Sequence, residues 1–157
     1  LGCEIGNHSW DHLDMLNLSI DDVIKEFGDT DQALIDACGQ ESTVIRPPYG
    51  DCNDEIISAV GKPFILWSID SLDWKDLPAG EITERVVSRV QPGSIVLFHN
   101  AALHTPEALP AILETLLQEG YTFVPISELI LPGEYNVDYT IDHTGRQLPA
   151  QPSSSPR

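Results

Sequence analysis

Short apolar segments rich in β-branched residues alternate along this sequence with segments of helical periodicity, and this alternation is the strongest constraint on its fold. The strand-like segments are CEIGNH (3–8), TVIR (43–46), PFILWSID (63–70), SIVLFHN (94–100) and YTFVPI (121–126). Stretches such as FILW and SIVLF are apolar almost throughout, which is typical of strands buried on both faces. We therefore predict an α/β fold with a mainly parallel sheet and helices packed outside it.

The predicted helices begin and end at recognisable capping residues. Ser19, with Asp22 three residues later, begins a helix whose apolar residues recur at helical spacing until Gly39 ends it. Further helices are predicted for DEIISAV (54–60), ITERVVSRV (82–90) and PEALPAILETLLQE (106–119), with a last helical turn at SELI (127–130). One domain is predicted to span residues 1–131, followed by an extension, residues 132–157, that contains a hairpin and a disordered tail.

The charge of the chain limits its partners. Lysine and arginine number 8 against 25 aspartates and glutamates, which gives a formal net charge of −17. Nucleic acid and anionic membranes repel such a surface, so neither is an expected partner. No apolar run approaches the roughly 18 residues of a membrane span. Three cysteines without a C-x-x-C pair also argue against a disulfide framework.

Four polar residues lie at the C-terminal ends of predicted strands: His8, Arg46, Asp70 and His99. In parallel α/β folds the carboxyl ends of the strands meet at one edge, where functional sites are built. We therefore expect these four residues to contribute to one site at that edge.

His8 and His12 lie four residues apart in HSWDH. Two imidazoles at this spacing suit Zn²⁺ or a similar cation. The H-E-x-x-H pattern of metalloproteases is absent, because Glu is missing from its second position. The structural alternative is two surface or capping histidines, which would be favoured for an isolated pair. The position after a strand favours the metal site instead.

The other candidates have structural alternatives as well. Arg46 in RPPYG can hold a carboxylate and lower its pKa, or lie on an exposed turn. Asp70 in DSLDW can orient a histidine or cap a turn, and Trp74 can line a pocket or pack in the core. His99 in VLFHN can act as a general acid or base, or be a hydrogen-bonded core histidine.

Taken in order, HSWDH, RPPYG, DSLDW and LFH resemble the later signature motifs of the polysaccharide deacetylases, the NodB-type domain of carbohydrate esterase family 4. The flanks GCEIGNH and EGYTFVPISELI are also similar to that family, so the resemblance covers residues 1–130. It implies a distorted (β/α) barrel and a hydrolase that removes N-acetyl or O-acetyl groups from peptidoglycan, a chitin-like glycan or xylan. A secreted or cell-envelope location follows from those cell-wall substrates.

The resemblance also implies a metal and an oxyanion site. His8 and His12 would bind a divalent metal, zinc, with cobalt, nickel and manganese as alternatives. The metal would activate a water and polarise the acetyl carbonyl. Arg46 would hold the aspartate that acts as catalytic base, and the backbone N–H of Tyr49 would help to stabilise the oxyanion.

Two further roles implied by the resemblance concern the leaving group and the acetyl methyl. His99, oriented by Asp70, would donate a proton to the leaving amine. Trp74 and Leu97 would line a small apolar slot for the methyl group.

One motif of the family has no counterpart here, the T-F-D-D-like strand end whose aspartates serve as catalytic base and third metal ligand. Asp21 and Asp22 lie in a predicted helix after the histidines and do not qualify. The chain also begins at Leu1 within a predicted strand. We therefore expect a partial barrel without its first strands, which is inactive alone. We expect that a second chain carries the missing N-terminal segment, that the native chain was cleaved, or that self-association covers the open sheet edge. The alternative is a non-catalytic carbohydrate-binding relative, against which His99 with Asp70 argues.

Overall fold

The computed structural model describes residues 3–130, 139–141 and 147–149 of the 157-residue chain. The chain divides into two compact units, unit 1 (Leu1–Leu66) and unit 2 (Trp67–Arg157). Each unit has its own cluster of buried apolar side chains. The two units are therefore described one at a time.

Unit 1 combines helices with short parallel strand contacts. Its helical segments are the 3-10 helix η1 (Met15–Asn17), α1 (Ile20–Cys38), the 3-10 turn η2 (Pro48–Gly50) and α2 (Asp54–Val60). Asn7 forms a parallel bridge with Ile45, and Ile45 forms a second one with Phe64. The first three predicted strands therefore pair in parallel, although each contact is a single bridge.

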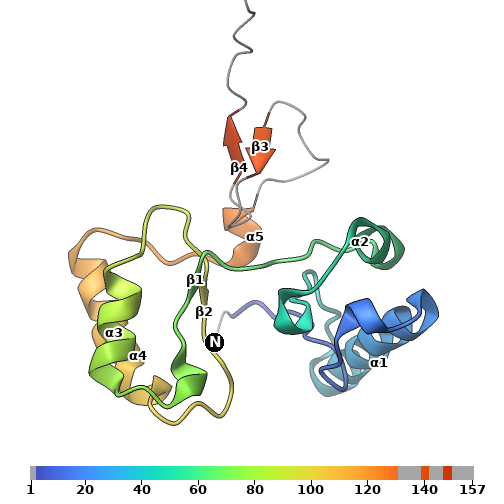
Figure 1. Cartoon of the computed structure of the whole chain (residues 1–157), viewed down its shortest axis with the longest axis horizontal. Coiled ribbons are helices and arrows are strands. Elements are labelled where there is room, and N and C mark those ends of the chain that lie inside the picture. Colours follow the sequence, from blue (N-terminus) through green and yellow to red (C-terminus); the bar gives the residue numbers. More distant parts are fainter. Residues whose placement is uncertain (1–2, 131–138, 142–146, 150–157) are drawn as a thin grey trace, which may run out of the picture. The chain divides into compact units, whose positions relative to one another are not determined.

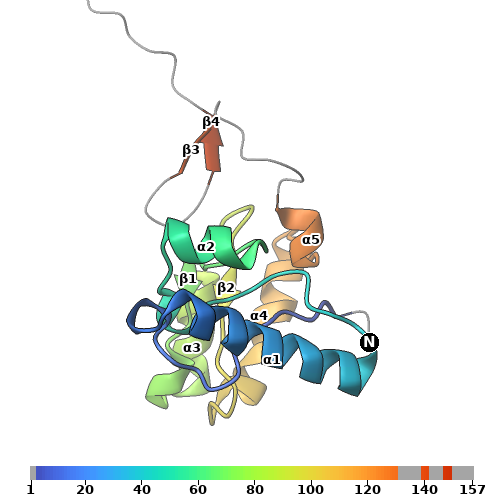
Figure 2. The same cartoon turned by 90° about the vertical axis from the view of Figure 1, so that its right-hand side faces the viewer.

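Helix α1, coloured blue in Figure 2, begins and ends where the sequence predicts. The hydroxyl of Ser19 accepts a hydrogen bond from the backbone N–H of Asp22, which satisfies one of the unpaired donors of the first turn. Gly39 follows the helix with φ of 74°, a left-handed conformation that glycine adopts without a Cβ clash. Val23 and Phe27, four residues apart, bury one face of the helix.

The core of unit 1 forms where this apolar face of α1 meets the strand residue Ile45. Its buried members are Met15, Val23, Phe27, Ile45 and Ile56. Ile45 has no exposed surface, and the ring of Phe27 meets that of Phe64 edge to face at 5.8 Å. Because His8 and Arg46 each follow a bridged residue, this packing fixes the backbone from which both side chains project.

Unit 2 contains a pair of parallel strands and several helices (Figure 1). In chain order its elements are β1 (Ile69–Asp70), the 3-10 helix η3 (Asp73–Lys75), α3 (Ala79–Val87), β2 (Val96–Leu97), α4 (Thr105–Gln118), α5 (Ile126–Leu129), β3 (Tyr139–Ile141) and β4 (Gln147–Pro149). β1 and β2 lie side by side, with Ile69 opposite Val96 and Asp70 opposite Leu97. The parallel pairing predicted for these two segments is present.

The core of unit 2 lies between α3 and α4, which pack along each other (Figure 1). Its buried members recur every three or four residues on each helix: Ile82 and Val86 on α3, and Ala108, Ile112 and Leu116 on α4. Val96 and Phe98, on and after β2, pack against this cluster. The helices thereby fix the strand that leads into His99.

The last predicted strand, residues 121–126, and the predicted extension, residues 132–157, are the remaining parts of the sequence prediction. Residues 121–125 form no strand pair with any described residue, and Phe123 and Val124 are exposed. An extended segment becomes a strand only when a neighbour pairs with its backbone groups. In the predicted extension, β3 and β4 pair antiparallel. The predicted tail, residues 150–157, lies outside the described residues.

Candidate functional site

The predicted metal ligands His8 and His12 lie together in the loop that precedes η1. Their imidazole rings meet edge to face, with centroids 4.9 Å apart, and both side chains are exposed. Nδ1 of His8 lies 2.6 Å from the backbone oxygen of Arg46. A carbonyl oxygen only accepts, so Nδ1 carries the proton and Nε2 of the neutral ring presents its lone pair. This is the arrangement of a metal-binding histidine oriented by a backbone carbonyl.

Tyr49 lies beside the same pair, at 4.8 Å from His12 between ring centroids. Its φ is 59°, in the left-handed region that a residue with a Cβ adopts only at an energetic cost. Pro47 and Pro48 are buried and immobilise the chain directly before it. Backbone strain of this kind persists where the surrounding structure enforces it, and it is concentrated at functional sites.

Arg46 occupies the end of the central bridged segment of unit 1. Its guanidinium donates hydrogen bonds to the backbone oxygens of Ile65, at 3.3 Å from Nε, and Leu66, at 3.4 Å from Nη2. Burial lowers the pKa of Arg46 from its ordinary value, but arginine remains protonated in proteins. Unit 1 therefore holds a permanent positive charge here, and the predicted role of holding a catalytic carboxylate stays a prediction.

The donor set of unit 1 suits a borderline divalent cation such as zinc. Two neighbouring imidazoles, one of them oriented through its second nitrogen, are ordinary zinc ligands. Among the described residues, no group of three or more histidine, cysteine, aspartate and glutamate side chains is arranged to hold a metal. His8 and His12 thus fit as two ligands, one fewer than the three protein ligands usual in a catalytic zinc site.

In unit 2, His99 is held by Asp73. Oδ1 of Asp73 lies 2.7 Å from Nδ1 of His99, and Oδ2 accepts the backbone N–H of His99 at 3.0 Å. Oδ2 also accepts the hydroxyl of Thr105 at 2.6 Å. The Asp73 side chain has no exposed surface, whereas that of His99 is 35% exposed. The carboxylate is therefore fully engaged within the protein, while the imidazole reaches solvent.

The ionisation of Asp73 determines which ring nitrogen of His99 carries a proton. Burial raises the pKa of Asp73, but the hydrogen bonds from Thr105 and from the backbone and ring of His99 outweigh burial and lower the pKa below 3.8. An ionised carboxylate only accepts, so Nδ1 of His99 carries a proton and Nε2 is left to exchange one. This is the arrangement of a histidine that acts as a general acid or base.

The structure corrects the carboxylate that was predicted to orient His99. Asp70 is the carboxylate predicted from the sequence, but its Oδ1 accepts the backbone N–H of Leu72 at 2.8 Å, the capping role that was its structural alternative. The residue at His99 is Asp73, on η3. Nothing in the sequence indicates the role of Thr105, which lies directly before the helix predicted for residues 106–119. The signal for Asp73 was the second aspartate of DSLDW.

The two residues predicted to line an acetyl slot differ in exposure. Trp74 follows Asp73 directly, and its ring centroid lies 6.4 Å from that of His99, with 53% of the residue exposed. Leu97, two residues before His99 on β2, is 7% exposed. The structure thus brings Trp74 beside His99, and the shared apolar slot stays a prediction.

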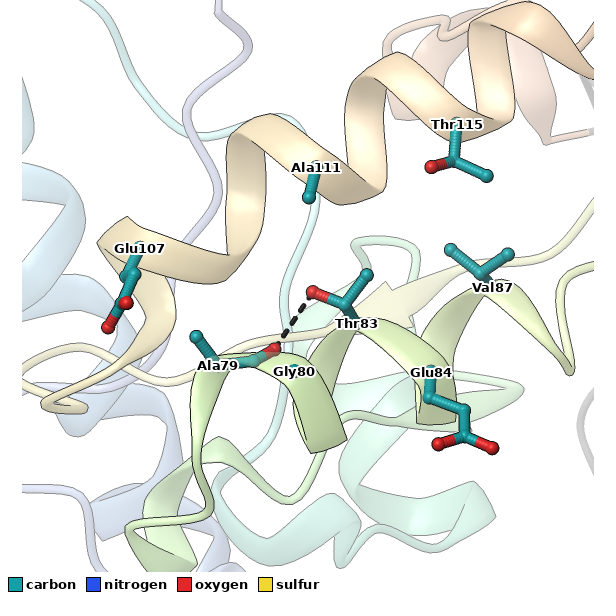
Figure 3. Close-up of a pocket in the computed structure, with 8 residues that line it drawn as sticks. All are labelled: Ala79, Gly80, Thr83, Glu84, Val87, Glu107, Ala111 and Thr115. Carbon is teal, nitrogen blue, oxygen red and sulfur yellow. Dashed lines mark hydrogen bonds between the residues drawn. The ribbon is translucent and has the colours of Figure 1, made fainter.

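A shallow groove of about 460 Å³ runs between α3 and α4 and includes none of the predicted site residues (Figure 3). It is lined by Ala79, Gly80, Thr83, Glu84, Val87, Glu107, Ala111 and Thr115. The hydroxyl of Thr83 donates to the backbone oxygen of Ala79 at 2.8 Å. The small side chains on the facing helices account for the groove, so its presence does not mark the candidate site.

The structure defines an α/β protein with parallel strand contacts. Two neighbouring histidines lie in a loop of unit 1, and a buried aspartate holds a histidine after β2 in unit 2. Residues 1–62 match the family model described as polysaccharide deacetylase. The chain belongs to the polysaccharide deacetylase family, and the predicted fold class, α/β of the polysaccharide deacetylase type, is confirmed.

Named relatives and solved structures agree with this assignment. The chain is 38% identical over 128 residues to the peptidoglycan-N-acetylglucosamine deacetylase PgdA of Listeria monocytogenes, a match that covers 82% of this chain and 28% of the relative. The structure of the peptidoglycan deacetylase PdaC from Bacillus subtilis matches with a TM-score of 0.78 and 35% identity, covering 82% of this chain and 63% of that one. A CE4 family pseudoenzyme from Bacillus anthracis matches with a TM-score of 0.77 and 32% identity, over 80% and 46%.

The chain therefore spans less than two thirds of each of these proteins. Within the part of the chain that the structure describes, none of the helices has the length and apolar character needed to cross a membrane.

Proposed function

We propose that this chain takes part in the metal-dependent hydrolysis of acetyl groups on a polysaccharide, with peptidoglycan as the favoured substrate class. The observation that carries the proposal is the fully buried carboxylate of Asp73, which holds His99 by both its ring and its backbone. The names of the Listeria and Bacillus subtilis relatives favour peptidoglycan over xylan or a chitin-like glycan. A secreted or envelope location would follow from that substrate.

His99 is the proposed general acid. Asp73 fixes the proton on Nδ1, so Nε2 is the atom that gains a proton and passes it to the leaving amine. Asp73 also holds the ring in place, since its Oδ1 lies 2.7 Å from Nδ1 of His99. Asp70 is assigned a structural role in the turn instead.

His8 and His12 are the proposed ligands of a divalent metal, zinc or, alternatively, cobalt, nickel or manganese. A divalent metal held there would lower the pKa of a bound water and polarise the acetyl carbonyl. Tyr49 would donate its backbone N–H to the developing oxyanion, and its strained φ fixes the direction of that N–H. Arg46 would hold a catalytic carboxylate through its permanent charge.

Trp74 and Leu97 are the proposed walls of the acetyl-methyl slot. Trp74 is 53% exposed and lies beside His99, and an exposed indole suits contact with a sugar ring or a methyl group.

Acetate release from peptidoglycan fragments and from an N-acetylated chito-oligosaccharide, at saturating zinc, tests the proposal. We expect no turnover by the 157-residue chain alone, because its described residues supply two imidazoles and no third protein ligand. A longer polypeptide that contains this chain should release acetate, and its His99→Asn variant should lose about 10²- to 10⁴-fold in kcat, the usual contribution of general acid catalysis. Unchanged kcat in that variant would remove His99 from the mechanism.

A second candidate is a carbohydrate-binding relative without chemistry. The likeness to a CE4 family pseudoenzyme supports keeping this alternative. The binding candidate would be favoured if every polypeptide that contains the chain bound oligosaccharide without releasing acetate, and if His99→Asn left that binding unchanged. Loss of turnover with binding intact in the same variant would favour the enzyme.

A further inference from the structure

The loop that carries His8 and His12 is held by side chains rather than by regular backbone pairing. Four consecutive backbone N–H groups of this loop each donate to a side-chain oxygen. The bonds are Ser9 N to Asn7 Oδ1 at 2.9 Å, Trp10 N to Glu26 Oε2 at 3.2 Å, Asp11 N to Glu26 Oε2 at 2.9 Å, and His12 N to Ser9 Oγ at 3.0 Å. Replacing these oxygens would leave the loop's donors to water.

The same loop contains two strained positions. Ser9 has φ of 66° and His12 has φ of 56°, both in the left-handed region. Each such residue costs roughly 1–2 kcal/mol relative to ordinary backbone geometry. The loop therefore needs compensating interactions, and the side-chain hydrogen bonds are of the right size to supply them.

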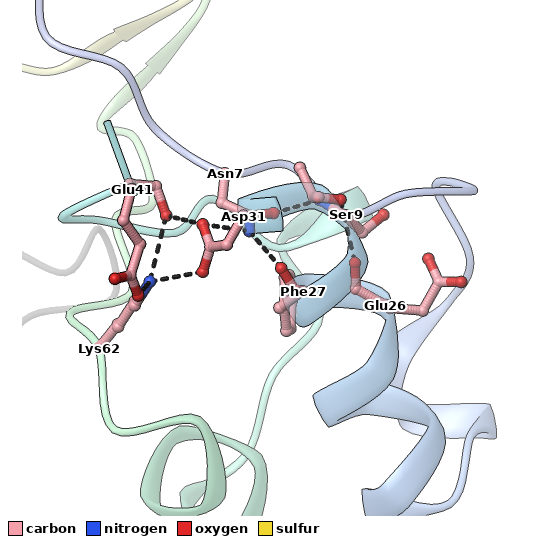
Figure 4. Close-up of polar contacts among 9 residues, drawn as sticks. Asn7, Ser9, Glu26, Phe27, Asp31, Glu41 and Lys62 are labelled. Carbon is pink, nitrogen blue, oxygen red and sulfur yellow. Dashed lines mark hydrogen bonds and ion pairs between the residues drawn. The ribbon is translucent and has the colours of Figure 1, made fainter. Parts of the chain in front are cut away.

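Two of the holding groups are anchored on helix α1 (Figure 4). Glu26 projects from α1, and one of its carboxylate oxygens accepts two adjacent loop N–H groups. Asn7 is 1% exposed, and its amide nitrogen donates to the backbone oxygen of Phe27 at 2.8 Å and to Oδ1 of Asp31 at 3.0 Å. Both acceptors belong to α1, so this helix sets the position of the loop.

The anchor on α1 is itself fixed by further polar contacts (Figure 4). Oδ1 of Asp31 accepts the hydroxyl of Ser42, and Oδ2 accepts the ammonium of Lys62. Lys62 also pairs with Glu41 at 2.7 Å. The Asp31 carboxylate thus cannot rotate away from Asn7 without losing several partners.

From this geometry we infer that Glu26, together with Asn7, is a positioning residue that holds His8 and His12 in place for a divalent metal. The inference rests on the proposed function, in which these two histidines are metal ligands. Glu26 acts through the loop backbone at positions 10 and 11, between the two imidazoles in the chain. Hydrogen-bonded groups that orient metal ligands typically change metal affinity by 10- to 100-fold when they are removed.

The test compares variants of the 157-residue chain for zinc affinity, by competition with a chromophoric chelator. Glu26→Ala should bind zinc 10- to 100-fold more weakly than the wild type. Glu26→Gln retains an acceptor oxygen and should recover most of that loss. Asp29→Ala removes the same charge from the same helix at an exposed site paired with Lys25, and should leave the affinity unchanged. An equal loss in Asp29→Ala, or no loss in Glu26→Ala, would overturn the inference.

Amide hydrogen exchange supplies a readout that does not need the metal. Glu26→Ala should speed exchange at Trp10 and Asp11 by at least tenfold, with the global urea midpoint nearly unchanged. Unchanged exchange at these two amides would overturn the positioning role. Asn7→Ala is a weaker test, since Asn7 is buried and its loss can unfold unit 1.

The failure of the proposed function is distinguishable from the failure of this inference. If the wild-type chain binds no zinc, or binds it equally well without His8 and His12, the proposed metal site is wrong. Exchange at the loop amides then decides alone whether Glu26 holds the loop. If zinc binding needs both histidines but is indifferent to Glu26, the inference is wrong and the metal site stands.

Discussion

Asp73 contacts His99 twice, with Oδ1 at 2.7 Å from the ring nitrogen Nδ1 and Oδ2 at 3.0 Å from the backbone nitrogen. One buried carboxylate therefore fixes both the position of the residue and the proton on its ring. A carboxylate that only capped the backbone would leave the imidazole free to rotate. The double contact is the feature that separates this pair from a histidine that is merely packed in a core.

Asp73→Asn should change the tautomer of His99. The amide oxygen of asparagine can still accept a hydrogen bond, but its amide nitrogen can only donate, so it cannot replace the second carboxylate oxygen of Asp73. The His99 ring is then no longer held in the tautomer that carries its proton on Nδ1. The free energy of unfolding should fall by roughly 2–3 kcal/mol, because buried hydrogen-bonded donors lose a charged acceptor. Nitrogen-15 shifts of the imidazole and urea unfolding measure the two effects.

Asp70→Asn is the matched control for that experiment. Asp70 accepts only the Leu72 N–H among the contacts described for its side chain, in a partly exposed turn. The change should leave the His99 tautomer as in the wild type and alter the free energy of unfolding by less than about 1 kcal/mol. A tautomer shift in Asp70→Asn, and none in Asp73→Asn, would reverse the assignment.

Thr105→Val should weaken the hold of Asp73 on His99, because Thr105 donates a hydrogen bond to the Asp73 carboxylate. Valine has nearly the same shape but no hydroxyl, so Oδ2 of Asp73 loses its 2.6 Å hydrogen bond in a site where Thr105 is 7% exposed. The pKa of Asp73 should rise, and unfolding should become easier by about 1–2 kcal/mol. Carbon-13 titration of the Asp73 carboxyl and urea unfolding check both. Thr105→Ser keeps the hydroxyl and should restore most of the pKa and the stability.

The fold of the units follows from patterns that the sequence displays directly. Ser19 and Gly39 bound α1 because a hydroxyl cap and a left-handed glycine are local requirements that the neighbouring residues already meet. Residues 121–125 have the same strand-like composition as 94–100 but remain unpaired with any described residue, because pairing depends on a partner segment and not on composition.

The sequence predicts a site residue when that residue lies at the end of a strand segment, but not when its contacts depend on how a turn folds. His8 and Arg46 follow strand segments of unit 1, and the parallel order of those segments indicates that both residues lie at one edge of that unit. His99 comes after β2, which pairs in parallel with β1 in unit 2. The choice between Asp70 and Asp73 depends instead on how η3 turns the chain after β1. Two aspartates three residues apart give no sequence signal for that turn, so the orienting carboxylate was misassigned.

Acid should destabilise the chain through its buried carboxylates. Burial raises the pKa of Asp31, but hydrogen bonds from Lys62, Ser42 and Asn7 lower it more, and the pKa of Asp73 is lowered similarly. Folded-state values below 3.8 mean that these groups contribute their full stability above pH 3.8 and lose it as pH falls through the folded value. The free energy of unfolding in urea should therefore drop below about pH 4.

The double variant Asp31→Asn with Asp73→Asn isolates that effect. Protonation of exposed carboxylates acts in the opposite direction, because it relieves the repulsion that accompanies a net charge of −17. In the double variant, the fall in the free energy of unfolding below about pH 4 should therefore become smaller or reverse. Asp21→Asn changes an exposed residue and should leave the pH dependence as in the wild type. Identical acid limbs in the wild type and the double variant would show that other groups govern acid unfolding.

Zinc should stabilise the chain, and the stabilisation should depend on His8 and His12. At a free zinc concentration of 100 times Kd, one bound ion raises the free energy of unfolding by about 2.7 kcal/mol. His8→Ala or His12→Ala removes a ligand outright, so the loss of affinity should exceed the 10- to 100-fold typical of groups that only orient a ligand. Calorimetric titration and thermal unfolding with and without zinc measure both quantities.

The control for that experiment is His104→Ala, because His104 precedes α4 in unit 2 and lies 3.6 Å from Glu107, outside the loop that carries the predicted ligands. Its zinc affinity and its stabilisation by zinc should equal those of the wild type. The orientation of His8 gives the experiment a further check: since Nδ1 lies against the Arg46 carbonyl, the zinc should shift the Nε2 resonance and leave the Nδ1 proton in place. Equal stabilisation of the wild type and of a chain lacking both His8 and His12 would mean that zinc binds elsewhere, and the proposed metal ligands would have to be abandoned.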